Sequence, residues 1–272
     1  MRDFPQELVD QVIDELFVLV GRSNSYPDSF KRFRGPSGYV HGISHYSLVS
    51  RAWAGPAQKH HFSILHLDCP TILEKWVACV PPDPNGVSRH VRKLVLDGFD
   101  PLDLEDFGEH LHAFTRVECL TVDNCLGTLH HPFILEWFLA MGSSLVELRI
   151  SDSPVTSQTI TSLLSALPLL KSLEVFNFEN PDDEDDENLS APSSILFFEG
   201  GNRFALRSDP GHRYPEGSLD WIPPSARFRQ LEVDMTCSLN HPDLVNQWFV
   251  ASCTMLTSLT IREDREGMFS PM

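Results

Sequence analysis

The chain contains 272 residues, 42% of them hydrophobic, and carries a formal net charge of −17 at pH 7. This length and composition are ample for a sizeable core. The strongly acidic balance argues against a nucleic-acid backbone or an anionic membrane surface as partner, because both require clustered lysine and arginine. No run of about 18 or more apolar residues occurs, so the sequence predicts no transmembrane helix.

The N-terminal residues and the cysteines indicate the compartment. The chain begins Met1-Arg2-Asp3-Phe4-Pro5, with acidic residues close behind, and lacks the basic and apolar regions of a secretory signal. Its six cysteines form no CxxC pairs, so reduced thiols are expected. We therefore expect a cytoplasmic or nuclear protein.

The first predicted element is an amphipathic helix over residues 4–17. Leu8, Val12 and Leu16 recur four residues apart along one stripe of this helix. Ile13 lies beside the stripe. The helix therefore has one apolar face that must either pack within the protein or meet a partner.

Two further helices are expected in residues 1–62. A loop rich in glycine, serine, proline and basic residues is predicted over 21–42, a short helix over 45–53 and a third helix over 56–62. A helical unit of about sixty residues buries little apolar surface and is marginal alone. Its apolar side chains have two candidate roles, which are binding a partner or covering the end of the following domain.

The rest of the chain repeats one pattern seven times: an apolar residue, two free positions, a leucine, one free position and another apolar residue. The central leucines are Leu65, Leu94, Leu120, Leu148, Leu173, Leu231 and Leu259. Successive leucines are separated by 29, 26, 28, 25, 58 and 28 residues. Because 58 is twice 29, a further degenerate unit is predicted between Leu173 and Leu231, with its strand near 204–206.

Each copy of the pattern predicts a short strand with one buried face, followed by a helix. The helices are expected over 71–80, 101–114, 132–141, 157–167 and 242–252. Trp76, Trp137 and Trp248 recur at helix positions and are predicted to lie in the core. A period of 25–29 residues is typical of leucine-rich repeats. The predicted fold is α/β: a leucine-rich-repeat solenoid of about eight units over 63–272, with a parallel strand layer and outer helices.

Six carboxylates occur in a row over 182–187. They repel one another and cannot pack, so residues 180–190 are predicted to form a solvated acidic loop inserted between repeats. An acidic docking site for a basic partner is the alternative.

Residues that flank the buried leucines should point away from the helices, because side chains alternate along a strand. Seven of these outward positions are acidic and three are basic, which favours a target with a basic or polar patch. The candidate target-binding residues are Lys93, Val95, Thr121, Arg149, Glu174, Glu232 and Thr260. A merely solvated face is the alternative interpretation.

The sequence offers no enzyme signature. It lacks phosphate-binding loops, dinucleotide fingerprints, the HExxH motif and the GxSxG motif. The pairs His60-His61 and His130-His131 have no carboxylate or cysteine at ligand spacing, so no metal or cofactor is predicted.

The N-terminal residues carry a resemblance to a known family. Pro5-Gln6-Glu7-Leu8 precedes a hydrophobic helix, Ser47-Leu48-Val49-Ser50-Arg51-Ala52-Trp53 comes next, and Phe62 leads into the repeats. This arrangement resembles an F-box, and the whole chain resembles the F-box/leucine-rich-repeat proteins of the large fungal set.

That resemblance implies a substrate-recognition subunit of a cullin-type E3 ubiquitin ligase with no active site of its own. Residues 1–62 would bind a Skp-type adaptor, and the repeats would bind a target protein whose identity the sequence does not reveal. The implied adaptor-binding residues are Phe4, Pro5, Leu8, Val12, Ile13, Leu48, Val49 and Trp53. The alternative is a non-catalytic repeat scaffold that is independent of ubiquitination. Exposure of this apolar surface would favour the ligase subunit.

Overall fold

The computed structural model describes most of the two predicted regions. The described residues are 5–23, 51–100, 103–104, 107–125, 129, 132–153, 155, 157–176, 196–207, 219, 221–234 and 241–262. The predicted acidic loop over 180–190 and the adaptor candidates Phe4, Leu48 and Val49 lie outside these residues.

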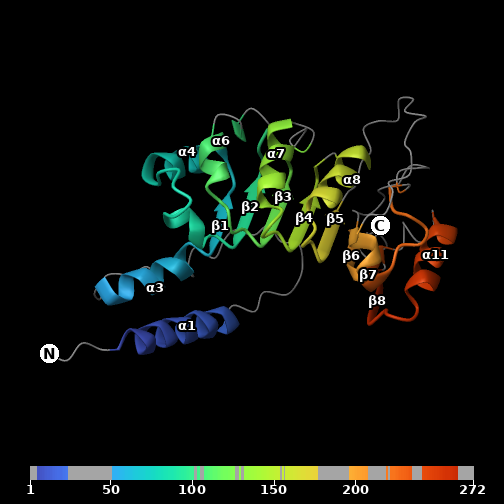
Figure 1. The fold of residues 1–272 in the computed structure, drawn as a ribbon, viewed down its shortest axis with the longest axis horizontal. Coiled ribbons are helices and arrows are strands. Elements are labelled where there is room, and N and C mark those ends of the chain that lie inside the picture. Colours follow the sequence, from blue (N-terminus) through green and yellow to red (C-terminus); the bar gives the residue numbers. More distant parts are fainter. Residues whose placement is uncertain are drawn as a thin grey trace, which may run out of the picture.

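The protein is built around one open sheet of eight parallel strands in the order β1-β2-β3-β4-β5-β6-β7-β8 (Figure 1). The strands are β1 (Ile64–Leu67), β2 (Lys93–Asp97), β3 (Cys119–Asp123), β4 (Glu147–Ser151), β5 (Ser172–Phe176), β6 (Asn202–Arg207), β7 (Phe228–Asp234) and β8 (Ser258–Arg262). Every strand pairs with the next one along the chain, as expected where one small unit is repeated.

Strand β6 confirms the strand near 204–206 that the doubled leucine spacing predicted. Phe204 stands in register between Leu173 and Leu231, at the position that leucine occupies in the other units. A phenylalanine fills this position, so the leucine pattern alone did not reveal the strand.

Helices line one face of the sheet, and Figure 1 shows α4, α6, α7 and α8 ranged along it. The helices that connect the strands are α4 (Pro70–Cys79), α6 (Gly108–His112), α7 (Pro132–Met141), α8 (Ser157–Ala166), α9 (Leu196–Glu199) and α11 (Pro242–Ser252), with the 3₁₀ helix η1 at Val87–His90. The helices predicted over 71–80, 132–141, 157–167 and 242–252 are confirmed to within one residue at each end. The helix predicted over 101–114 is not continuous, because Asp103 and Leu104 are helical, Phe107 lies in a turn and α6 spans Gly108–His112.

The core lies between the sheet and these helices. The two apolar residues that each of β2–β7 presents to the helices are at most 1% exposed. Trp76, Trp137 and Trp248 are buried as predicted. The indole N–H of Trp137 donates to the carbonyl oxygen of Leu111 at 2.9 Å, which joins α7 to α6.

The two ends of the sheet differ. At the β1 end, Leu67 is fully buried and Leu65 is half-buried. At the β8 end, Leu259 is 43% exposed and Ile261 is 50% exposed, so the prediction that this strand buries one face is wrong. The physical reason is that β8 is the edge strand and, in the part of the chain that is described, no further unit packs on it.

The N-terminal region forms a helical pair, α1 (Gln6–Ser23) and α3 (Arg51–His61), next to β1 (Figure 1). Val9, Ile13 and Ala57 form a small buried cluster between the two helices, and Trp53 packs against it. Helix α1 runs six residues beyond its predicted end at residue 17. The predicted break between helices 45–53 and 56–62 is also wrong, because α3 is continuous through Pro56.

Candidate functional site

The predicted target-binding residues gather on the sheet surface opposite α4, α6, α7 and α8, which we call the open face. Strand register places eight residues in one row across it: His66, Val95, Thr121, Arg149, Glu174, Ala205, Glu232 and Thr260. Six of the seven candidates are in this middle row. The seventh, Lys93, lies in the adjacent row.

Burial separates these candidates into two groups. Val95 is 4% exposed and Glu174 is 2% exposed, so neither offers surface to a partner, contrary to the prediction. Longer side chains from neighbouring strands reach over Glu174. Lys93, Thr121, Arg149 and Glu232 are half-buried and Thr260 is exposed, so these five remain accessible.

Three guanidinium groups surround the buried carboxylate of Glu174. The Arg207 Nη1 lies 2.7 Å from its Oε1, while Arg203 Nη1 and Arg149 Nε lie 3.5 and 3.7 Å from its Oε2. A buried carboxylate is costly unless cations compensate it. The open face therefore holds Glu174 as an internal counter-ion for these arginines, which come from β4 and β6.

Arg207 also binds a second carboxylate two strands away from Glu174. Its Nε and Nη2 donate to the two oxygens of Glu232 at 2.8 and 2.9 Å, and Arg262 also pairs with Glu232. Burial alone would raise the pKa of Glu232, but Arg207 and Arg262 outweigh it and lower that pKa. Ala205 lies between Glu174 and Glu232 in register and is fully buried, so its small side chain leaves room for Arg207 to span both carboxylates.

A second polar group lies nearer β2. Arg149 Nε donates to Glu147 Oε1 at 2.8 Å, and the Cys119 thiol donates to Glu147 Oε2 at 3.4 Å. Burial, and then the nearby Glu147 carboxylate, raises the pKa of Cys119 to about 11. Burial, and then Arg149, lowers the pKa of Lys93. Burial raises the pKa of Glu147, but the Arg149 guanidinium outweighs this and the net shift is downward.

This arrangement suits polar recognition. Cys119 remains protonated at neutral pH, and a thiol is a far weaker nucleophile than a thiolate. Among the described residues, no three His, Cys, Asp or Glu side chains lie together as potential metal ligands. His60, one of the histidines considered as a ligand, pairs with Asp14 of α1. None of the described helices is long and apolar enough to cross a membrane.

The N-terminal helical pair presents a second surface. Leu8 and Val12 of α1 are 45% and 40% exposed, and Pro5 is exposed. Ile13 is buried against α3 and Trp53 is half-buried there, so Ile13 cannot contact a partner as predicted. Val9 was not among the predicted residues, although its spacing of four from Ile13 marks the stripe of α1 that faces α3.

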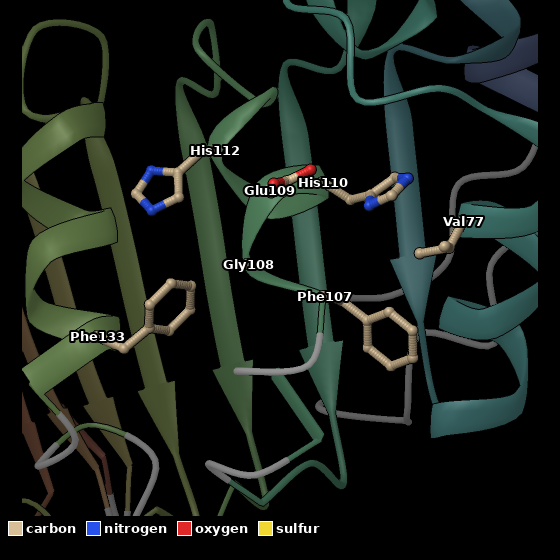
Figure 2. Close-up of a pocket in the computed structure, with 7 residues that line it drawn as sticks. All are labelled: Val77, Phe107, Gly108, Glu109, His110, His112 and Phe133. Carbon is tan, nitrogen blue, oxygen red and sulfur yellow. The ribbon is translucent and has the colours of Figure 1, made fainter.

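The helix layer contains a hollow of about 530 Å³ that the sequence did not predict (Figure 2). It is lined by Val77, Phe107, Gly108, Glu109, His110, His112 and Phe133, which come from α4, α6 and α7 and from the residue before α6. Figure 2 shows Phe133 and His112 on one side of the hollow and Phe107 and Val77 on the other. Its polar side chains, Glu109, His110 and His112, are exposed or half-buried.

Comparison with known proteins gives no family assignment. No protein-family model matches the chain, and no curated protein matches it.

Proposed function

We propose that this chain is the substrate-recognition subunit of a Skp/cullin/F-box-type E3 ubiquitin ligase. In this proposal α1 and α3 belong to an F-box-like domain over 1–62 that binds a Skp-type adaptor. A leucine-rich-repeat solenoid over 63–272 binds the target protein. The chain itself would supply no catalytic group and would act by holding the target near an enzyme carried elsewhere in the complex.

The exposure of Leu8 and Val12 is the observation that supports adaptor binding best. Val9 and Ile13 already provide the contact of α1 with α3, so Leu8 and Val12 are not needed for that packing. Two large apolar side chains one turn apart on the free side of an amphipathic helix suit insertion into an apolar groove.

The open face supports target binding by the repeats. Its accessible residues combine cationic, anionic and hydroxyl side chains, and most of the charges are paired with one another. Such a surface favours a protein target that makes hydrogen bonds and ion pairs over a target that needs a strong field of one sign.

Binding to a purified Skp-type adaptor, measured by calorimetry, tests the proposal. The double variant Leu8→Asp/Val12→Asp should bind the adaptor about tenfold or more weakly, because it would bury two carboxylates in the apolar groove of the adaptor. Gln11→Asp is the matched control, because it adds a carboxylate at an exposed position of the same helix. Circular dichroism checks that each variant remains folded.

The control should bind as the parent does. If the folded parent shows no binding, the proposal fails and the alternative of a repeat scaffold independent of ubiquitination takes its place. Equal binding by the parent and by the double variant would remove α1 from the interface.

A further inference from the structure

We propose that the β8 end of the sheet binds a second copy of this chain through antiparallel pairing of β8 with β8. Strand β8 pairs only with β7 among the described strands, so its other edge presents backbone N–H and C=O groups. This inference is independent of the proposed ligase function.

On the helix side of the sheet, the apolar residues of β8 are far more exposed than those of β2–β7. Leu259 and Ile261 are 43% and 50% exposed, whereas the corresponding residues of β2–β7 are at most 1% exposed. Helix α11, which precedes β8, adds the exposed side chains Phe249 and Val250. Large exposed apolar residues gathered next to a free sheet edge mark an interaction surface.

The other end of the sheet does not offer a matching surface. On the helix side of β1, Leu67 is fully buried and Leu65 is half-buried, while the exposed Ile64 lies on the open face. In a head-to-tail contact Leu259 and Ile261 would therefore face strand residues that are already largely covered. An interface between two β8 ends brings exposed apolar groups onto each other. Such an interface is two-fold symmetric and closes as a dimer, whereas head-to-tail pairing would continue as a filament.

The sequence of β8 is complementary to itself in this arrangement. Antiparallel pairing centred on Thr260 sets Leu259 opposite Ile261 of the second copy, and Ser258 opposite Arg262. Leucine therefore meets isoleucine on the helix side, and no like charges face each other. Arg262 already pairs with Glu232 of its own copy, so its charge is compensated within each chain.

The dimer would join the two open faces on the same side of one continuous sheet. The two-fold axis runs perpendicular to the sheet, midway between the two Thr260 residues, which keeps both helix layers together on the opposite side. Because α1 and α3 lie next to β1, the helical pairs would stand at the two far ends (Figure 1). A target with two binding segments would then gain from avidity.

The mass of the full chain in solution tests the inference, measured by light scattering over about a hundredfold range of concentration. The parent should be a dimer that dissociates on dilution. Leu259→Lys/Ile261→Lys should be a folded monomer, since both side chains are exposed in a single copy. Leu139→Lys is the matched control, because Leu139 is a leucine on α7 that is 56% exposed, and this variant should behave as the parent.

A cysteine at the centre of the pairing tests the register. Directly opposed residues of an antiparallel pair have Cα atoms about 4.5 to 5.5 Å apart, within reach of a disulfide. In a Cys79→Ser/Cys253→Ser background, which removes two exposed thiols, Thr260→Cys should therefore form a covalent dimer under mild oxidation that the background protein does not form. A parent that is monomeric at every concentration overturns the inference, as does a dimer that persists in Leu259→Lys/Ile261→Lys.

Discussion

The side-chain amide of Gln6 donates a hydrogen bond to the carbonyl oxygen of Ala52 at 3.0 Å. In a regular helix that carbonyl would accept from the N–H of residue 56, four positions on. Residue 56 is proline and has no N–H. The first residue of α1 thus supplies the donor that α3 lacks, which explains how α3 continues through Pro56.

We predict that Gln6→Ala lowers the free energy of unfolding by about 1 kcal/mol, the usual net value of one hydrogen bond. The other bond of this amide, to the exposed Asp10 at 2.8 Å within the same helix, adds little. Urea denaturation followed by circular dichroism measures the change. Gln11→Ala removes an exposed glutamine from the same helix and controls for helix propensity. In a Pro56→Ala background residue 56 recovers its N–H, so Gln6→Ala should cost clearly less there; an equal cost in both backgrounds would contradict this explanation.

The continuity of α3 illustrates how far the sequence predicts this fold. The leucine spacing predicted eight strands, including the strand between Leu173 and Leu231. The same short pattern recurs seven times at similar spacing, so each copy supports the interpretation of the others. The error at Pro56 arose because a donor from a distant residue cannot be seen in a local pattern. Proline predicts a helix break only when nothing else satisfies the carbonyl four residues before it.

The open face shows the same limit for the candidate site. Alternation along the strands predicted correctly which side chains share that face. It could not predict that Glu174 is buried there, because the arginines that cover it come from β4 and β6 and are recognised only in the folded register. The exposure of Leu259 likewise depends on whether another element packs beside β8, and the pattern within the strand carries no information about such a neighbour.

The buried carboxylate of Glu174 should matter more for stability than an ordinary surface pair. Glu174→Gln leaves Arg203 and Arg207 beside a neutral amide, and we expect a loss of about 2 kcal/mol in the free energy of unfolding. Glu118→Gln is the control, because Glu118 pairs with Arg92 in an exposed ion pair at 2.9 Å. The control should lose about 0 to 1 kcal/mol. If the two variants lost similar amounts of unfolding free energy, burial would not strengthen the ion pairs of Glu174.

The lowered pKa values of Glu147 and Glu232 predict how stability depends on pH. Each carboxyl has a folded-state pKa below its ordinary value of 4.5, so just below that pH the unfolded chain binds more protons than the folded chain. Their contribution is therefore fully present above about pH 4.5 and is lost as pH falls through the lowered pKa values. Urea unfolding between about pH 3 and 7 measures this, and the acid-side slope should be smaller in Glu232→Gln than in the parent. Parallel curves for the two proteins would contradict the assignment.

The cysteine thiols should differ in reactivity according to burial. Burial raises the pKa of Cys119 and Cys125 from 9.0 to about 11, so each has roughly a hundredfold less thiolate near neutral pH than an unperturbed thiol. Cys79 and Cys253 are exposed. Alkylation of the folded protein at neutral pH, mapped by peptide mass spectrometry, should therefore label Cys79 and Cys253 at least tenfold faster. If Cys119 and Cys125 were labelled as fast as Cys79 and Cys253, the regions around Cys119 and Cys125 would have to unfold locally and often in solution.

Gly108 has a packing role beside the hollow between α6 and α7. A Cβ atom built on it would lie 2.7 Å from Cζ of Phe133, closer than atoms in contact can approach. We predict that Gly108→Ala lowers the free energy of unfolding by about 1 to 3 kcal/mol, because the Phe133 ring must leave its position.

Gly55 provides the matched comparison. It lies in α3, and a Cβ atom there would meet nothing within 4 Å, so Gly55→Ala should stabilise the protein by about 0.4 to 1 kcal/mol through higher helix propensity. Thermal and urea denaturation should show a lower free energy of unfolding for Gly108→Ala and a higher one for Gly55→Ala. Phe133→Leu frees the space that the new methyl group needs, so Gly108→Ala should cost less in that background than in the parent. If the cost does not fall, contact with Phe133 is not the reason for glycine at this position.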